Sequence, residues 1–213
     1  MILLGDGAVG KTSIAKRFSQ DTFGPQYKQT VGVDFLSRHM SIPPNYQVTM
    51  QLWDIGGQSI GSRSVRNYIS GANAALLCYD ITNYESFANL EDWYRLVVDA
   101  FEGEEMPQCA LIANKTDLKH MAQVSLVKHT QFLEENDMLS FQISAKSGDQ
   151  IQLCFFKVAA HLLGIEDAVP TTEATTMGSV LPATIIDSQR HDEDVNGGKV
   201  GDYTKEKSGC ALS

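Results

Sequence analysis

The sequence predicts an α/β fold in which short buried strands alternate with amphipathic helices around one mostly parallel sheet. Two observations support this prediction. Short apolar runs typical of buried strands recur along the chain and are separated by segments with apolar residues at helical spacing. A glycine-rich stretch also joins the first apolar run to the first helical segment, as in phosphate-binding strand–loop–helix units.

Length and composition restrict the possible classes of protein. The 213 residues allow one α/β domain, expected at 1–165, and an extension at 166–213. A formal net charge of −9 argues against a nucleic-acid partner. The four cysteines have no C-x-x-C spacing, so neither a disulfide framework nor a zinc site is expected. No signal peptide or membrane-spanning run is visible, which favours a cytoplasmic location.

The predicted sheet has six strands with helices on both faces. Its elements are strands at 1–4, 31–42, 47–53, 74–79, 110–113 and 141–143, and helices at 12–20, 87–101, 124–135 and 151–162. The second and third strands are expected to form an antiparallel hairpin, and residues 59–70 a polar loop. Four polar motifs begin directly after predicted strands, at Gly5, Asp54, Asn114 and Ser144. Because ligands bind beyond the carboxyl ends of such strands, these positions should converge on one rim.

The first glycine-rich stretch, Gly5–Thr12, fits the phosphate-binding pattern G-x-x-x-x-G-K-[ST]. Glycines let successive backbone N–H groups turn toward a polyphosphate, and the following helix adds the positive end of its dipole. Lys11 would then contact the β- and γ-phosphates, and the Thr12 hydroxyl would be a ligand for Mg²⁺.

Further motifs follow in a fixed order: Thr30, Trp53-Asp-Ile-Gly-Gly-Gln58, Asn114-Lys-Thr-Asp117 and Ser144-Ala-Lys146. With them, the chain resembles a small GTPase of the Ras superfamily, in its Rab branch, and within that branch an atypical member with a single-cysteine tail. The resemblance covers residues 1–165 and the last four residues. It implies a P-loop NTPase G domain that binds GTP and GDP with Mg²⁺.

Guanine selection is expected at Asp117, whose carboxylate can accept hydrogen bonds from guanine N1–H and the 2-amino group, whereas adenine presents an acceptor there. The resemblance implies that Asn114 braces the pocket and that Phe23 and the Lys115 stem cover the base. The Ala145 N–H would meet guanine O6. The full expected nucleotide-binding set is Gly7, Ala8, Val9, Gly10, Lys11, Thr12, Ser13, Phe23, Tyr27, Thr30, Gly57, Asn114, Lys115, Asp117, Ser144, Ala145 and Lys146.

By the same resemblance Thr12, Thr30 and Asp54 hold Mg²⁺, Lys11 is catalytic, and Gln58 orients the attacking water. Unaided hydrolysis should be slow, on the order of 10⁻⁴ to 10⁻³ s⁻¹. Two loops, 23–36 and 54–70, are expected to change with the γ-phosphate and to contact an exchange factor, a GTPase activator and effectors. Ile55-Gly56 replaces the family's usual Thr-Ala, and the glycine pair at 56–57 should loosen the second loop.

The last residues, Cys210-Ala-Leu-Ser213, fit the C-a-a-X pattern for prenylation, with the terminal serine favouring farnesyl. The preceding segment from 166 has the composition of a disordered tail. A prenyltransferase is therefore an expected partner at Cys210. One lipid gives only reversible membrane binding, so we expect a peripheral protein at the cytoplasmic face of membranes.

Two other functions remain open from the sequence. The first is a membrane-tethered, nucleotide-binding scaffold with little hydrolysis, which the Ile55-Gly56 substitution motivates. The second is a different P-loop enzyme such as a nucleotide kinase. Asp117 speaks against it, as does the lack of an arginine-rich lid.

Overall fold

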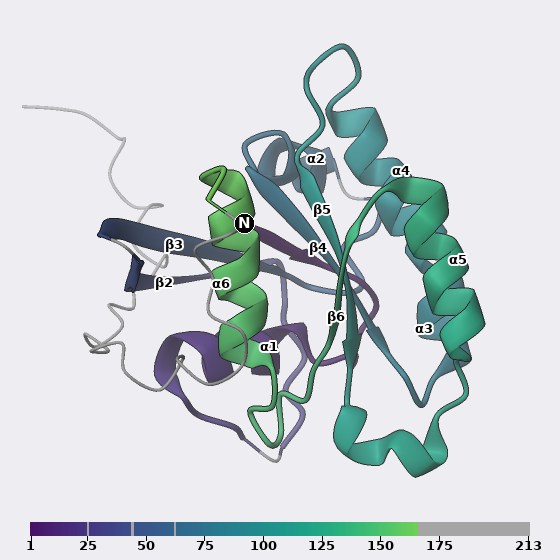
Figure 1. The fold of residues 1–213 in the computed structure, drawn as a ribbon. Helices are drawn as coiled ribbons and strands as arrows, with labels where there is room; N and C mark the ends of the chain where they lie inside the picture. The colour runs from purple at the N-terminus through teal and green to yellow at the C-terminus, as the bar shows by residue number, and fades with distance from the viewer. Residues whose placement is uncertain (25, 44, 62, 166–213) are drawn as a thin grey trace, which may run out of the picture.

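A computed structural model describes residues 1–165 of the chain except 25, 44 and 62 (Figure 1). The expectations for 166–213, including Cys210, lie outside these residues. The elements are β1 (Ile2–Leu4), α1 (Lys11–Gln20), β2 (Val33–Ile42), β3 (Tyr46–Ile55), α2 (Arg63–Ile69), β4 (Ala74–Asp80), α3 (Tyr84–Ala88), α4 (Leu90–Ala100), β5 (Gln108–Asn114), the 3₁₀ helix η1 (Thr116–Met121), α5 (Leu126–Asn136), β6 (Leu139–Gln142) and α6 (Ile151–Leu162).

The six strands form one sheet in the order β2-β3-β1-β4-β5-β6. Among the strands of the described residues, only β2 and β3 pair in antiparallel fashion, while the other neighbouring strands are parallel. The six-stranded, mostly parallel sheet with one hairpin is therefore confirmed. Although β1 has three residues, it lies in the middle of the sheet, and Ile2 pairs with both Trp53 and Ala75.

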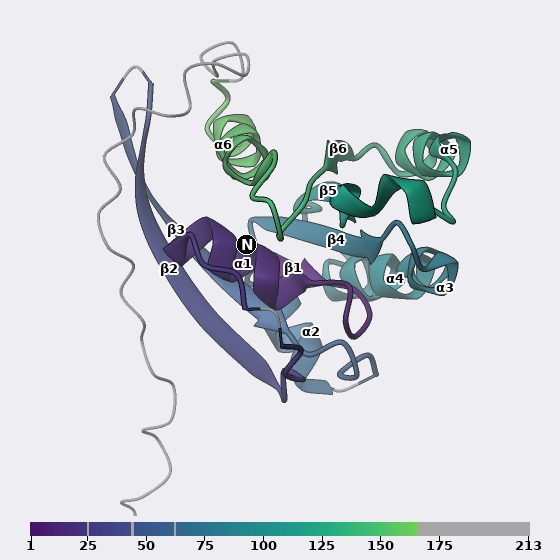
Figure 2. The same cartoon turned by 90° about the horizontal axis from the view of Figure 1, so that it is seen from below.

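Helices cover both faces of the sheet, as Figure 2 shows edge-on. One apolar cluster joins α1 and α6 to the sheet, and the other joins α2, α3 and α4 to its opposite face, with apolar residues of α5 packed against it. Successive side chains of a strand point to opposite faces, so Leu3 enters the first cluster while Ile2 and Leu4 enter the second. All seven residues of β4 are buried, as expected for a central parallel strand.

The structure corrects two sequence predictions. Residues 63–69 form helix α2 rather than a polar loop, and its Val65 and Ile69, four positions apart, are buried. The helix expected at 87–101 is divided into α3 and α4 at Asn89. Helix α3 begins where the Asn83 side chain accepts from the N–H groups of Glu85 and Ser86.

No helix in the described part of the chain is long and apolar enough to cross a membrane.

The backbone is packed very closely where β1 ends. Gly5 has a φ of +132°, and a Cβ at this position would lie 2.2 Å from the carbonyl oxygen of Cys78 in β4. Neither the backbone conformation nor the neighbouring strand leaves room for a side chain. This contact fixes the path by which the chain leaves the sheet toward α1.

We expect Gly5→Ala to lower the free energy of unfolding by at least about 2 kcal/mol, because it combines an unfavourable φ with overpacking against backbone. Gly71→Ala is the matched control, since φ at Gly71 is not positive and nothing lies within 4 Å of a Cβ there. It should change stability by less than about 0.5 kcal/mol. Urea unfolding of the two variants in the same buffer checks the difference, and equal stabilities would contradict it.

Candidate nucleotide-binding site

The glycine-rich loop lies between β1 and α1 and presents a buried ammonium group. Lys11 Nζ donates to the carbonyl oxygens of Gly5 and Asp6 at 2.6 and 2.7 Å. Burial lowers the pKa of Lys11, while the nearby charge of Asp54 opposes that shift. Helix α1 begins directly after Gly10, whose φ of 101° requires glycine. The positive end of a ten-residue helix and a buried lysine thus face the same loop.

Asp6 of this loop also forms hydrogen bonds with residues on the opposite face of the sheet. The sequence did not predict these contacts. Asn89 Nδ2 donates to Asp6 Oδ2 at 2.7 Å, and Trp93 Nε1 donates to Asp6 Oδ1 at 2.9 Å. Trp93 is fully buried. Both oxygens of this carboxylate are therefore bound to the α3–α4 junction.

Three oxygen-bearing side chains of different segments meet beside the loop. The Thr12 and Thr30 hydroxyl oxygens lie 2.8 Å apart, and both contact Asp54 Oδ2. Asp54 is completely buried, and burial raises its pKa. Its second oxygen, Oδ1, is buried and has no hydrogen-bond partner within the described part of the chain. Two hydroxyls and a carboxylate with an unpaired oxygen fit a hard cation such as Mg²⁺.

The two loops expected to sense the γ-phosphate are in direct contact through glycines. Gly56 N–H donates to the Gly32 carbonyl at 2.9 Å, and a Cβ on Gly56 would lie 2.5 Å from the Thr30 carbonyl oxygen. A Cβ on Gly57 would lie 2.1 Å from the Gly7 nitrogen. The expectation that the glycine pair loosens this loop stays a prediction. In the structure the pair allows close backbone contacts that larger residues would prevent.

Gln58 lies at the edge of the same contact. Its Oε1 accepts a hydrogen bond of 2.8 Å from Gln29 Nε2, and both glutamines line the cavity described below. The residue expected to orient water therefore faces the phosphate side of the site.

At the other end of the site, Asn114 connects three segments. Its Nδ2 donates to the Val9 carbonyl at 2.8 Å, and its Oδ1 accepts from the Ala145 N–H at 3.1 Å. The N–H expected to meet guanine O6 is thus bound to Asn114 in this structure. Asn114 thereby joins the phosphate loop to the segment at 144–146.

Asp117 is held at the same end by its neighbours. Its Oδ1 accepts from the Ser144 hydroxyl at 2.7 Å, and Lys146 Nζ lies 3.8 Å from its Oδ2. Lys115 adopts a φ of 69° and forms an ion pair of 2.6 Å with Asp80, a partner that the sequence did not indicate. The carboxylate of Asp117 thus stands where Asn114, Lys115 and the segment at 144–146 meet.

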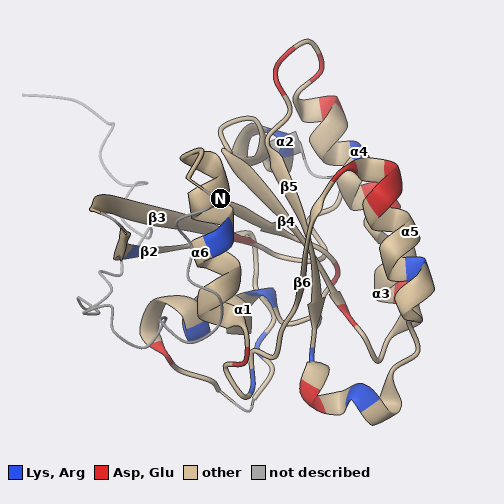
Figure 3. Ribbon diagram, in the orientation of Figure 1, with Lys and Arg blue, Asp and Glu red and all other residues tan. Residues whose placement is uncertain are grey.

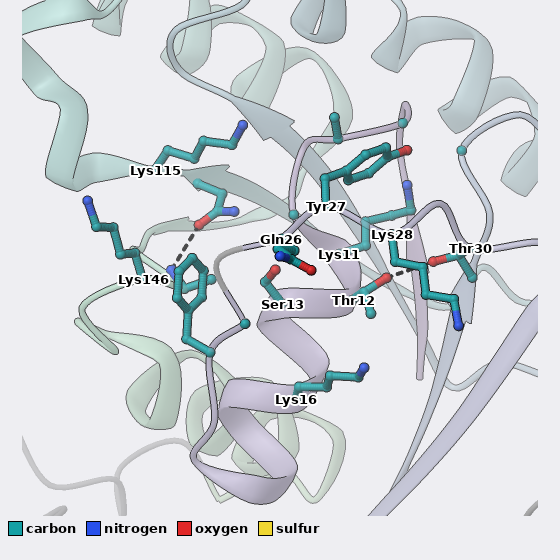
Figure 4. A pocket seen from close by; sticks show the side chains of 18 of the residues that line it. Lys11, Thr12, Ser13, Lys16, Gln26, Tyr27, Lys28, Thr30, Lys115 and Lys146 are labelled. Carbon is teal, nitrogen blue, oxygen red and sulfur yellow. Dashed lines mark hydrogen bonds between the residues drawn. The ribbon is translucent and has the colours of Figure 1, made fainter.

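These groups surround a cavity of about 380 Å³ (Figure 4). Of the residues that the structure describes, five lysines line it: Lys11, Lys16, Lys28, Lys115 and Lys146. Most of the expected nucleotide-binding residues also line the cavity, namely Gly7, Ala8, Gly10, Lys11, Thr12, Ser13, Phe23, Tyr27, Thr30, Gly57, Asn114, Lys115, Asp117, Ala145 and Lys146. Val9 and Ser144 are buried and do not line the cavity, but each is hydrogen-bonded to a residue that does, Asn114 and Asp117 respectively.

Several lining residues were not predicted, namely Lys16, Thr22, Gly24, Gln26, Lys28, Gln29 and Leu118. The available signal was the position of most of them in the loop between α1 and Thr30.

Figure 3 shows acidic residues on the loop after α4 and on α5. Lysines dominate the charged lining of the cavity, which therefore suits a polyanion.

Comparisons with known proteins agree with this geometry. Residues 1–164 match the model of the Ras family. The chain is 37% identical to the Ras-related protein Rab-28 of Caenorhabditis elegans over 214 aligned residues, which cover 100% of this chain and 85% of that protein. It is 34% identical to the Ras-related protein Rab-30 of Homo sapiens over 182 residues, which cover 85% of this chain and 87% of that protein. Rab-30 of Mus musculus gives the same values.

A phosphate loop and an N-K-x-D segment thus line one cavity, and a buried carboxylate lies beside two threonine hydroxyls of that lining. Residues 1–164 of the chain match this family. The chain belongs to the Ras family, in its Rab branch: it is a small GTPase that switches between GTP- and GDP-bound forms in intracellular membrane traffic.

Proposed function

We propose that the cavity binds GTP or GDP with the phosphates at Gly5–Thr12 and the base at Asp117. The observation that carries this assignment is the distribution of charged groups in the cavity. Lysines line the cavity, and the carboxylate of Asp117 lies at the end away from the phosphate loop. Lysines attract the polyphosphate, whereas a carboxylate recognises two neighbouring N–H donors. Guanine has such donors at N1 and the 2-amino group.

Thr12, Thr30 and Asp54 would hold Mg²⁺, for which the unpaired Oδ1 of Asp54 provides a free ligand. When bound, the ion supplies positive charge to the β- and γ-phosphate oxygens. The raised pKa of Asp54 fits the same assignment, because a buried carboxylate is most stable beside a cation.

In hydrolysis, the oxygen of a water molecule forms a bond to the γ-phosphorus while the bond to the β–γ bridging oxygen breaks. GDP leaves with the bridging oxygen, and the proton of the water ends on the released phosphate. Gln58 orients that water, Gly57 N–H donates to the γ-phosphate, and Lys11 neutralises charge that develops on the phosphate oxygens. Each group already lines the cavity.

We expect Gln58→Leu to slow single-turnover GTP hydrolysis by about tenfold or more, because leucine neither donates to water nor accepts from it. Nucleotide affinity should stay within about threefold. Gln47→Leu is the control, since Gln47 is exposed and lies at the far end of β3 from Asp54. Equal rates in the wild type and Gln58→Leu would refute the catalytic role of Gln58 and favour the scaffold function.

We expect Asp117→Asn to weaken GDP binding by about 100-fold or more, because two hydrogen bonds to a charged acceptor are lost. Xanthosine diphosphate should bind the variant better than GDP does, since its 2-oxo group accepts from an amide. Competition against fluorescent GDP measures both affinities. Asp149→Asn is the nearby control, and an unchanged preference for guanine would place the base elsewhere.

The partners are proposed to contact the loops at 23–36 and 54–70. The support is the contact between these loops at Gly56 and Gly32, which lies next to Thr30 and Gly57. Loss of the γ-phosphate would remove the ligand that both segments share and so separate them. An exchange factor, a GTPase activator and effectors would distinguish the two states at this surface.

We further propose that 1–165 is the GTPase domain and that 166–213 is a tail prenylated at Cys210. The pattern Cys210-Ala-Leu-Ser213 supports this proposal and favours farnesyl. A prenyltransferase would act there, and a single lipid would give reversible attachment to the cytoplasmic face of a membrane.

Incubation with farnesyltransferase and farnesyl diphosphate should add one farnesyl group to the full chain, as read by mass spectrometry. Cys210→Ser should abolish the addition, and Ser208→Ala should leave it unchanged. Ser213→Leu should shift the preference to geranylgeranyl transfer. Modification that persists in Cys210→Ser would contradict the assignment.

A further inference from the structure

Arg17, near the end of α1, binds the backbone of the segment at 144–146. This segment borders the end of the cavity that contains Asp117, called the base end below. Its Nε donates to the Ala145 carbonyl at 3.0 Å, and its Nη2 donates to the Lys146 carbonyl at 2.8 Å. The side chain is only 18% exposed. Arg17 is not among the described residues that line the cavity, so it reaches the site only through other residues.

The same guanidinium also holds the segment that carries Phe23. Its Nη1 donates to the backbone oxygen of Asp21 at 3.1 Å and to the carboxylate of Asp21 at 3.2 Å. The guanidinium carbon lies 6.0 Å from the centroid of the Phe23 ring, within range of a cation–π contact. One side chain thus contacts both segments that border the base end, although they lie more than 120 residues apart in sequence.

The segment at 144–146 is held from its other side as well. The Ala145 N–H donates to Asn114, and the Ser144 hydroxyl donates to Asp117. Arg17 thus binds carbonyl groups of the segment at 144–146, whereas Asn114 and Asp117 bind an N–H and a hydroxyl group of the same segment. The segment is therefore held from both sides. The stem of Arg17 also packs near Gly148, where a Cβ would lie 3.6 Å from Arg17 Cδ.

A guanidinium suits this position because its donors point in fixed, coplanar directions, so that it can bind two consecutive carbonyls at once. A lysine ammonium can be placed near one carbonyl but cannot match the fork. The ion pair with Asp21 does not explain the arrangement by itself, because the Asp21 side chain is 84% exposed and such pairs contribute little.

We propose that Arg17 is a positioning residue for guanine recognition, which holds Ala145, Lys146 and Phe23 around the base and thereby limits the rate of nucleotide release. This proposal rests on the proposed placement of the base at Asp117. Arg17 does not touch the nucleotide or the reacting atoms. Its loss should therefore affect dissociation of the nucleotide and leave the chemical step unchanged.

The test uses the full chain loaded with fluorescent GDP, chased with excess GDP in the presence of Mg²⁺. Dissociation should be about 10- to 100-fold faster in Arg17→Met and about 3- to 10-fold faster in Arg17→Lys, in line with the cost of misplacing a binding group. Asp21→Asn, which removes only the ion pair, should stay within about twofold of the wild type, as expected for an exposed pair. Arg95→Met is the matched control, because Arg95 is an exposed helical arginine paired with Glu91 and Asp92.

Single-turnover hydrolysis in GTP-loaded protein separates positioning from general damage. The proposal requires hydrolysis within about twofold of the wild type in the variant whose dissociation is accelerated. If Arg17→Met does not fold, Arg17→Lys decides by the same two measurements. Unchanged dissociation overturns the proposal, and so does a parallel loss of hydrolysis and of resistance to urea, which would indicate a purely structural role.

The Asp117→Asn variant keeps this proposal distinct from the one on which it rests. If Asp117→Asn shifts binding toward xanthosine diphosphate while Arg17→Met releases GDP at the wild-type rate, only the role of Arg17 is refuted. If Asp117→Asn shows no shift, the placement of the base at Asp117 is refuted, and the proposal for Arg17 is refuted with it.

Discussion

The close packing of glycines in and around the phosphate loop is the constraint on which the rest of the site depends. Gly5 lies against the Cys78 carbonyl, Gly57 lies against Gly7, and a Cβ at Gly10 would lie 2.4 Å from Asn114 Nδ2. Each contact joins the loop to a different part of the molecule. Side chains at these positions would force β4, the loop that carries Gln58 and the Asn114 side chain to move away from the phosphate loop, so the observed shape of the cavity depends on the three glycines.

The same packing buries charges that are unfavourable by themselves. Burial lowers the pKa of Lys11 and raises that of Asp54, so burial disfavours the ionised form of each group. A polyphosphate beside Lys11 and a cation beside Asp54 would relieve both costs. Binding to the folded state alone adds stability by mass action, about 4 kcal/mol at a ligand concentration a thousand times Kd. Nucleotide is therefore expected to contribute a large part of the stability of this protein.

Much of the fold was predictable because its signals are local. Apolar runs marked all six strands, and the order of the motifs indicated the family that the comparisons confirm. Helix α2 was missed because seven residues with two buried apolar positions give too short a pattern. The contacts of Asp6 with Trp93 and of Arg17 with Ala145 were also missed, since they join residues 87 and 128 positions apart and no local spacing reports such pairs. The roles of individual site residues stay predictions.

Helix α1 carries Lys11 at its first turn and Arg17 toward its last. Between them the helix rises about 9 Å at about 1.5 Å per residue. Because an α-helix hardly stretches, α1 keeps a fixed distance between the end of the cavity at the phosphate loop and the end at Asp117. With the base at Asp117 and the phosphates at Gly5–Thr12, as proposed, a ligand would have to match that spacing as well as each end separately. Nucleosides without phosphates and bare pyrophosphate would each fill only one end, so the spacing would favour whole nucleotides over either fragment.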